Sequence, residues 1–358
     1  MYIYIHVPFC SSICNYCDFC KILYDKKYIK KYLFSLKEEI KERYGNEVVK
    51  TIYIGGGTPT SLDINELRNL LDITKIFKKD KKIEFTIESN VESLDELKIS
   101  LLKEYGVNRV SLGVQSFHLN ILKELGRSHD LNMVKEVVQN LKSAGIFNIS
   151  MDYIYGVNDD IDIVARDMKT FLSLDIPHIS CYSLIIEDGT KFGIDKREYI
   201  DDDKEREMYL KIEDILTSSS YYHYEISNYC KKGFESIHNL NYWNNGEYYG
   251  FGLGAVSYLD SVRISNTKNL SKYLEHQFLD NSIIEDRDVV ISNEFILGLR
   301  KIKGINISDF NCKYDIDIRS LFDIKDLLEK GYLEVVDGYL RIPKKYIYVS
   351  NDILVHFL

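Results

Sequence analysis

Near its start the chain runs from a short strand pattern into four cysteines: Tyr2-Ile-Tyr-Ile-His-Val7-Pro-Phe-Cys10-Ser-Ser-Ile-Cys14-Asn-Tyr-Cys17-Asp-Phe-Cys20. The run at 2–7 is rich in β-branched and aromatic residues, which predicts a buried strand that Pro8 ends. The cysteines therefore follow the carboxyl end of this strand. Their spacings of four and three allow three thiolates to converge on a [4Fe–4S] cube, whose fourth iron would stay open to a small molecule.

Other interpretations of these cysteines stay open from spacing alone. Zinc would need a further Cys or His pair at knuckle spacing, and none follows. A disulfide is disfavoured because no signal peptide is evident and the thiols crowd together, and a redox CxxC would use two cysteines. Cys20 is either a fourth ligand, which would close the cluster for electron transfer, or a bystander thiol.

Composition indicates a globular protein of two domains, or one large barrel with an appendage. The 358 residues are 45% hydrophobic and 28% charged, without an apolar run long enough to span a membrane. A net charge of −9 argues against a nucleic-acid partner, because phosphate contacts need a basic face. Seven cysteines without a secretion signal predict a reducing, cytoplasmic setting.

Six strand–helix units are expected in the first part of the chain. The expected strands lie at 2–7, 48–54, 83–87, 109–114, 147–154 and 178–185, and the expected helices at 26–44, 63 onward, 93–105, 130–143 and up to 174. Asp63 with Glu66, and Ser93 with Glu96, have the spacing of a capping box. Units in series predict parallel strands with right-handed crossovers, in a barrel or a doubly wound sheet.

The polar residues at strand ends locate the expected site. Cys10, Gly56, Glu88 and Gln115 lie at or just after carboxyl ends of strands, where active sites of parallel folds collect. A barrel of six units would be incomplete and would leave a lateral opening for a large substrate.

The pattern changes after about residue 198. A charged helix and an alternating strand precede His238-Asn-Leu-Asn-Tyr-Trp243, and the chain ends in helices and a hairpin around Asp337-Gly338. We expect a barrel domain at 1–200, a flanking extension at 201–285, and a small α+β, winged-helix-like domain at 286–358.

The CxxxCxxC spacing after Tyr4-Ile-His-Val-Pro-Phe, together with Cys17-Asp-Phe, resembles the radical S-adenosylmethionine (SAM) superfamily, and within it the oxygen-independent coproporphyrinogen III oxidase group. The resemblance implies an α/β fold with a partial (βα)6 TIM-like barrel. It also implies a [4Fe–4S] cluster held by Cys10, Cys14 and Cys17, with SAM on the fourth iron and Cys20 spare.

The resemblance implies a set of SAM contacts. The glycines 55–57 form no Walker A motif because no Lys follows. In the family such residues meet SAM, whose hydroxyl, ammonium and carboxylate groups suit carboxylate and guanidinium partners. The implied cofactor-binding residues are Tyr4, Gly56, Gly57, Thr58, Glu88, Gln115, Arg127 and Asp152.

The segments Glu225-Ile-Ser-Asn-Tyr and His238-Asn-x-x-Tyr-Trp resemble the HemW-type heme chaperones, which do not oxidise coproporphyrinogen. A single His is more often structural than a ligand, but imidazole is a natural axial ligand of heme iron, so His238 is the candidate heme-binding residue. Val256 stands where relatives carry a second His. The resemblance implies a longer N-terminal extension for an oxidase than the ten residues that lead to the cluster loop here.

The resemblance therefore implies a heme chaperone that binds a [4Fe–4S] cluster, SAM and heme and delivers heme to apo-hemoproteins. The alternatives are coproporphyrinogen oxidation by a 5′-deoxyadenosyl radical, with no catalytic residue assigned, and an electron-transfer module. Expected partners are heme or another tetrapyrrole, recipient hemoproteins and an electron donor such as flavodoxin or ferredoxin. A homodimer and peripheral membrane contact stay open.

Overall fold

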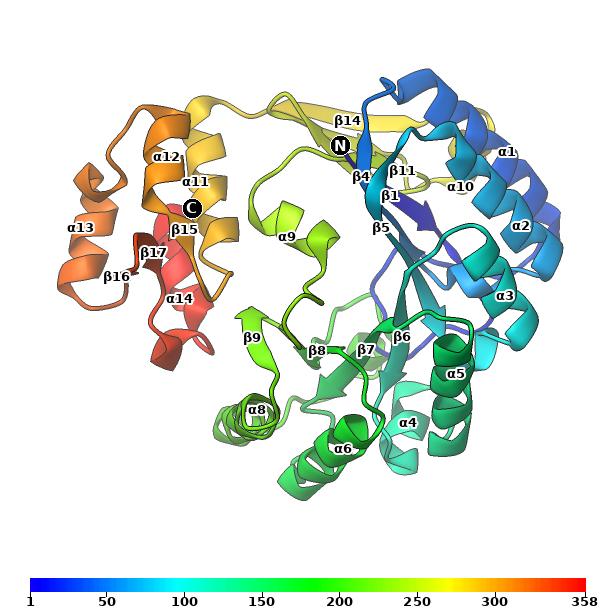
Figure 1. Ribbon diagram of the computed structural model, residues 1–358, viewed down its shortest axis with the longest axis horizontal. Coiled ribbons are helices and arrows are strands. Elements are labelled where there is room, and N and C mark those ends of the chain that lie inside the picture. Colours follow the sequence, from blue (N-terminus) through cyan, green and yellow to red (C-terminus); the bar gives the residue numbers. More distant parts are fainter.

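The computed structural model describes residues 1–358, apart from the side chain of Phe322. A curved nine-stranded sheet surrounds the middle of the molecule, with helices along its outer side (Figure 1). In sheet order the strands are β11 (Tyr249–Phe251), β1 (Tyr2–Val7), β4 (Val49–Gly56), β5 (Lys79–Asn90), β6 (Arg109–Gln115), β7 (Asn148–Tyr155), β8 (His178–Ser183), β10 (Asn228–Cys230) and β9 (Tyr222–Glu225).

Every neighbouring pair from β11 to β8 is parallel, and β10 and β9 continue the sheet in antiparallel pairing. In the part of the chain that the structure describes, the edge strands β11 and β9 do not pair with each other. The expectation of an incomplete TIM-like barrel built on six strand–helix units is therefore confirmed.

The barrel helices form because each presents one apolar side to the sheet. In α1 the residues Ile29, Leu36 and Ile40 are fully buried at helical spacing, and they belong to the same hydrophobic core as the buried Ile3 and Ile5 of β1. The helices of the barrel are α1 (Lys26–Arg43), α2 (Ile64–Ile73), α3 (Glu96–Glu104), α4 (Leu119–Leu125), α5 (Leu131–Ser143), α6 (Ile161–Ser173), α7 (Lys191–Ile194) and α8 (Asp202–Thr217).

One of the two predicted capping boxes is confirmed and the other is wrong. Asp63 caps α2, and Glu66 returns the hydrogen bond to its backbone N–H. In α3 the cap is Asp95, whose side chain accepts from the N–H of Lys98. Ser93 belongs instead to a short 3-10 turn that follows β5, so the helix starts later than the spacing indicated.

The residues of strand β6 alternate between the hydrophobic core and the cavity inside the barrel. All seven residues are buried, but Val110, Leu112 and Val114 join the hydrophobic core while the alternate residues line an interior cavity. That second set is Arg109, Ser111, Gly113 and Gln115. The period of two along the strand thus places polar groups inside the barrel.

Strand β11 is a finding that the sequence pattern did not predict. Only three residues long and with Gly250 at its centre, it gives no strand pattern of its own. It nevertheless pairs in parallel with β1, through Ile3 and Tyr249 among others, so a segment far along the chain covers the edge of the first strand.

The remaining elements lie outside the barrel sheet. They are β2 (Phe9–Cys10), β3 (Ile22–Leu23), α9 (Ile237–Trp243), β12 (Val256–Leu259), β13 (Val262–Asn266), α10 (Leu270–Leu274), β14 (Leu279–Ile284), α11 (Arg287–Gly298), β15 (Ile305–Asn306), α12 (Ile307–Tyr314), α13 (Phe322–Glu329), β16 (Glu334–Val336), β17 (Tyr339–Arg341) and α14 (Ser350–Leu354).

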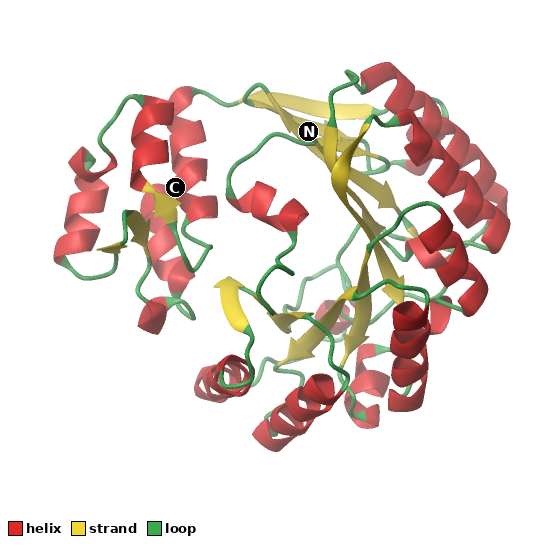
Figure 2. Ribbon diagram, in the orientation of Figure 1, coloured by secondary structure: helices red, strands yellow, loops and turns green.

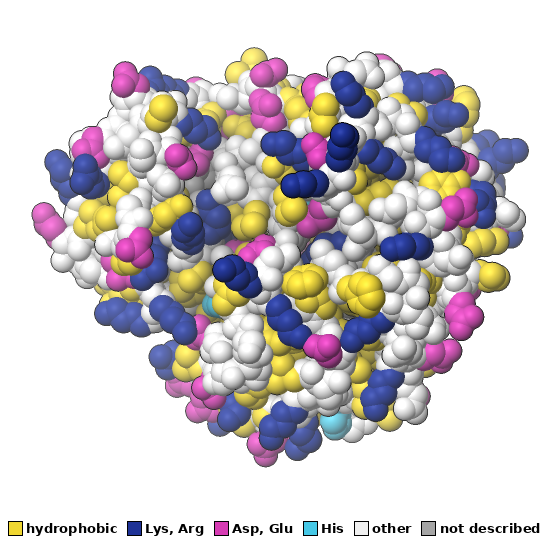
Figure 3. Space-filling model, in the orientation of Figure 1, with side chains coloured by type: hydrophobic (Ala, Val, Ile, Leu, Met, Phe, Trp, Pro, Cys, Tyr) yellow, Lys and Arg dark blue, Asp and Glu magenta, His cyan; other side chains and the backbone are white. Residues whose placement is uncertain are grey.

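From α11 onward the chain forms a separate group of helices beside a small sheet (Figure 2). Strands β16 and β17 pair around Asp337-Gly338, so the predicted hairpin is confirmed. No helix among the described residues is long and apolar enough to cross a membrane. The face in Figure 3 carries basic and acidic side chains with hydrophobic ones between them.

Candidate functional site

The cysteine loop, residues 10–21, is held by contacts to the far side of the barrel. The backbone N–H of Asn15 donates to the carbonyl of Leu125 at 3.1 Å, and its side chain donates to the carbonyl of Glu124 at 2.8 Å. The N–H of Phe192 donates to the carbonyl of Asn15 at 3.0 Å. These contacts fix the loop across the carboxyl ends of the barrel strands.

Cys10, Cys14 and Cys17 line one cavity of about 440 Å³ inside the barrel mouth. Cys20 does not line it; its sulfur packs beside Gly254, where an added Cβ would lie 3.2 Å away. All seven cysteines of the chain are free thiols. The fold therefore groups the three predicted ligands and sets Cys20 apart.

The donor set fits a cube better than a single metal ion. Among the described residues, no group of three or more Cys, His, Asp and Glu converges as the ligands of one ion would. A cube differs because each cysteine binds a different iron, which keeps the sulfurs apart. Burial raises the pKa of Cys10 to about 11, so iron must displace its proton.

The glycine run after β4 brings the backbone against the cysteine loop. The N–H of Gly57 donates to the carbonyl of Val7 at 2.9 Å, and the N–H of Thr58 donates to the carbonyl of Phe9 at 2.8 Å. A Cβ on Gly57 would lie 2.8 Å from the carbonyl of Pro8, so only glycine permits this approach.

The same glycine run makes room for Glu88. A Cβ on Gly55 would lie 2.8 Å from the Glu88 carboxylate, which accepts from the N–H of Gly56 at 3.0 Å and from the hydroxyl of Tyr53 at 2.8 Å. Burial raises the pKa of Glu88 to about 7, although both hydrogen bonds act in the opposite direction. Glu88 therefore changes charge near neutral pH.

Of the other predicted cofactor residues on strands, two line the cavity and one does not. Asp152 lines the cavity, accepts from the hydroxyl of Ser111 at 3.3 Å, and has a pKa raised by burial. Gln115 also lines the cavity, with a left-handed φ of 70°. Tyr4 does not line it, and its hydroxyl bonds Nδ1 of His6 at 2.9 Å.

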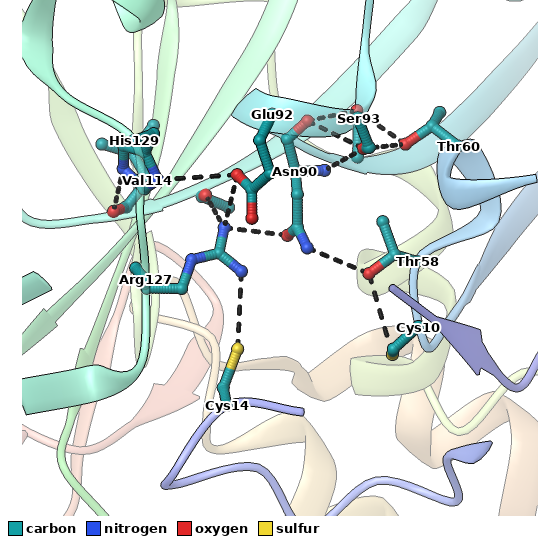
Figure 4. Close-up of polar contacts among 12 residues, drawn as sticks. Cys10, Cys14, Thr58, Thr60, Asn90, Glu92, Ser93, Val114, Arg127 and His129 are labelled. Atoms are coloured by element: carbon teal, nitrogen blue, oxygen red, sulfur yellow. Dashed lines mark hydrogen bonds and ion pairs between the residues drawn. The ribbon is translucent and has the colours of Figure 1, made fainter. Parts of the chain in front are cut away.

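Arg127 lies at the centre of the polar contacts (Figure 4). Its Nη2 donates to Oδ1 of Asn90 at 2.9 Å and to the carbonyl of Gly113 at 2.5 Å, and its Nη1 donates to Sγ of Cys14 at 3.5 Å. Glu92 lies 3.8 Å from Nη2. The buried Nε has no partner among the described residues, so the guanidinium retains capacity for an anion.

His238, the candidate heme ligand, lies outside this cavity. It is 1% exposed, and its Nδ1 bonds the hydroxyl of Thr51 at 2.7 Å while Nε2 bonds the hydroxyl of Tyr242 at 2.8 Å. Burial lowers the pKa of His238 to about 3, so the ring is neutral. A metal could reach either nitrogen only after one of these bonds breaks.

Helix α9, which carries His238, separates two cavities. Asn239 lines the cavity of the cysteines, whereas Leu240 and Asn244 line a second cavity of about 760 Å³ that faces α11 and α12. Figure 1 shows α9 between the barrel and the C-terminal group of elements. Movement of α9 would therefore alter both cavities.

Several cavity residues were missed by the sequence reasoning. Asn90 follows Glu88 at the strand period of two, and this spacing could have identified it. Arg109 stands at the start of a fully buried strand, is 2% exposed, and has a buried Nε without a hydrogen-bond partner among the described residues. Arg109 could have been identified from the sequence, because it is a charged residue at the start of an apolar strand. Further polar lining residues that were missed include Tyr53, Ser111, Ser180, Tyr182 and Asn239.

Comparisons with known proteins agree with this geometry. Residues 4–168 match the radical SAM superfamily, and residues 286–347 match the HemN C-terminal domain. The chain is 38% identical to the heme chaperone HemW of Lactococcus lactis, covering 99% of this chain and 96% of that protein. It is 35% identical to the Bacillus subtilis protein of the same name (99% and 98%) and 30% identical to that of Escherichia coli (99% and 97%).

Among solved structures, coproporphyrinogen III oxidase (HemN) of Escherichia coli, a radical SAM enzyme, matches with a TM-score of 0.87 at 20% identity. The match covers 99% of this chain and 89% of that one, and at this identity it establishes the fold alone. Full-length identity of 30–38% to proteins named HemW establishes the family. The chain belongs to the HemW family of heme chaperones within the radical SAM superfamily.

Proposed function

We propose that the chain is a heme chaperone that binds one [4Fe–4S] cluster, SAM and heme, and delivers heme to apo-hemoproteins. The observation that carries the proposal is identity to heme chaperones over the full chain, which spans both matched domains. The grouping of three cysteines in one cavity supports the cluster, and the polar lining of that cavity supports SAM.

In this proposal Cys10, Cys14 and Cys17 hold the cluster. A bound cluster and SAM would supply one-electron chemistry at the barrel mouth. Gly56, Gly57 and Thr58 are supported as SAM contacts by their place in the cavity beside the cysteine loop. Tyr4 belongs to the proposed set on resemblance alone.

The charged residues have separate proposed roles toward SAM. Glu88 and Asp152 accept from hydroxyl groups, Gln115 offers an amide, and Arg127 pairs with a carboxylate through its unpartnered Nε. Ionised Glu88 is an acceptor only, whereas its protonated form also donates.

His238 is the proposed heme-binding residue. A neutral imidazole is the form that binds iron, and burial keeps His238 neutral. The expected result for His238→Ala is loss of the heme absorption band in a titration of anaerobically reconstituted protein.

The test of the whole proposal measures heme binding, 5′-deoxyadenosine and porphyrin products on one anaerobic preparation. We expect saturable heme binding, transfer of heme to an apo-hemoprotein, and no conversion of coproporphyrinogen. Formation of protoporphyrinogen would overturn the chaperone assignment in favour of the oxidase.

The proposal also includes a one-electron donor such as flavodoxin or ferredoxin, and a cytoplasmic location that seven free thiols support. Light scattering of the reconstituted protein tests whether it forms a homodimer, and flotation with phospholipid vesicles tests peripheral membrane contact.

A further inference from the structure

The side chain of Asn90 bonds two residues, each of which donates a hydrogen bond to one of the three cavity cysteines. Its Oδ1 accepts from Nη2 of Arg127 at 2.9 Å, and its Nδ2 donates to Oγ1 of Thr58 at 3.0 Å. Arg127 in turn donates to Sγ of Cys14 at 3.5 Å, and Thr58 donates to Sγ of Cys10 at 3.8 Å. Figure 4 shows this chain running from one sulfur to the other.

The amide sets the direction of the Thr58 hydroxyl. A hydroxyl has one hydrogen, and a hydroxyl oxygen that accepts from an amide keeps that hydrogen for another partner. Because Nδ2 of Asn90 donates to Thr58, the hydrogen of Thr58 is directed to Sγ of Cys10. A carboxylate at position 90 would accept from Thr58 instead and turn the hydroxyl away from the sulfur.

The amide also holds Arg127 in place. Asn90 and the carbonyl of Gly113 occupy Nη2, which leaves Nη1 to reach Cys14. The Arg127 side chain is buried, so its planar guanidinium has little freedom to leave this position. One side chain thus positions two donors on two different sulfurs.

Hydrogen bonds to cluster sulfurs are among the factors that set the reduction potential of an iron–sulfur cluster. Reduction of a [4Fe–4S]2+ cluster to [4Fe–4S]1+ adds one electron, and donors to the sulfurs stabilise the more negative form. A donor in a buried site acts more strongly because little water screens it.

We propose that Asn90 is a positioning residue that raises the reduction potential of the cluster by directing Thr58 onto Cys10 and Arg127 onto Cys14. The inference rests on the proposed cluster ligands, but it concerns the cluster before SAM or heme binds. It would therefore hold whether the protein acts as a chaperone or as an oxidase.

The test measures the midpoint potential of the reconstituted cluster without SAM, by dithionite titration with mediators and electron paramagnetic resonance. Thr58→Val keeps the shape of the side chain and removes the donor to Cys10. At the wild-type midpoint we expect its ratio of reduced to oxidised cluster to fall about fivefold, the scale of one hydrogen bond. Thr58→Ser, which restores the hydroxyl, is expected to recover the wild-type potential.

Asn90→Asp tests the direction of the hydroxyl. The variant should lower the potential through its added charge and through the lost donation from Thr58. In the Thr58→Val background only the effect of charge is left, so the two changes should lower the potential by less than the sum of their separate effects.

Thr86→Val is the matched control, because Thr86 lies in the same strand as Asn90 and its buried Oγ1 has no hydrogen-bond partner among the described residues. Its potential should equal that of the wild type. A full cluster with an unchanged potential in Thr58→Val, or additive effects with Asn90→Asp, would overturn the inference. Failure of the wild-type protein to take up a [4Fe–4S] cluster would instead overturn the proposed function.

Discussion

The cavity at the carboxyl ends of the strands and the surroundings of His238 differ in whether their buried polar groups have hydrogen-bond partners. In the cavity, Nε of Arg109 and Nε of Arg127 are buried without a protein partner. At His238, both ring nitrogens are bonded at 2.7 and 2.8 Å. Because an unpaired buried polar group is costly, the cavity has groups to offer a ligand, whereas His238 already stabilises the fold.

The largest expected effect concerns the cysteines. Cys14→Ala removes a cavity sulfur and is expected to abolish the stable cluster, measured as iron content and absorbance after anaerobic reconstitution. Cys20→Ala is the matched control from the same loop, and it should keep the cluster because Cys20 lies outside the cavity. Loss of the cluster in Cys20→Ala would favour an electron-transfer module with four cysteine ligands.

His238→Ala tests whether His238 stabilises the fold. The substitution leaves the hydroxyls of Thr51 and Tyr242 without their partner and removes the ring that stacks on Tyr53 at 5.1 Å. We expect a loss of about 3 kcal/mol in the free energy of unfolding, measured with urea. The exposed His356→Ala should change it little, and equal stability of the two variants would contradict the structural role of His238.

Glu88 provides the pH test. The folded protein holds its proton up to a pKa of about 7, whereas an unfolded glutamate releases it near 4.5. Between these values the folded state binds more protons, so stability should fall as pH rises from 4.5 to 7 and then level off. We expect this site to contribute about 2 kcal/mol, because the cavity side of Glu88 meets water.

Glu88→Gln is the control for that pH dependence, since an amide cannot titrate. The difference in unfolding free energy between wild type and variant should decrease by about 2 kcal/mol across the window. A difference that stays constant with pH would show that Glu88 ionises at an ordinary pKa in the folded protein. Affinity for SAM should rise through the same window if the carboxylate accepts from hydroxyls.

The sequence predicted the six strand–helix units well because each has an alternating or helical pattern that is local. The cavity residues Cys10 and Glu88 were found because they stand at strand ends, and Asp152 was found because the motif around it resembles that of the family. Strand β11 was missed because three residues with a central glycine carry no pattern, and its partner β1 lies more than 240 residues away.

The side-chain contacts within the proposed site were less accessible from sequence. A motif can name Arg127, but only the fold shows that Asn90 and Cys14 share its guanidinium. A motif likewise marks His238 without showing that Thr51, a strand residue of the barrel, occupies one nitrogen. Long-range pairing of side chains depends on register and curvature, which no local pattern encodes.

Tyr242→Phe tests whether the hydrogen bonds of His238 oppose heme binding. It has the smallest expected effect on stability. The change removes the hydroxyl bonded to Nε2 of His238, which should lower stability by about 1 kcal/mol. If His238 binds heme iron through Nε2, the freed nitrogen no longer has to break a bond, and heme affinity should rise about fivefold.

Thr51→Val is the matched variant on the other nitrogen, since it frees Nδ1 and leaves the bond to Tyr242 intact. A rise in heme affinity in one variant and not in the other would identify the nitrogen that binds iron. Unchanged affinity in both, with the expected loss of stability, would show that His238 only supports α9. The heme would then have to bind elsewhere, because a ligand that breaks no bond at His238 gains nothing from either substitution.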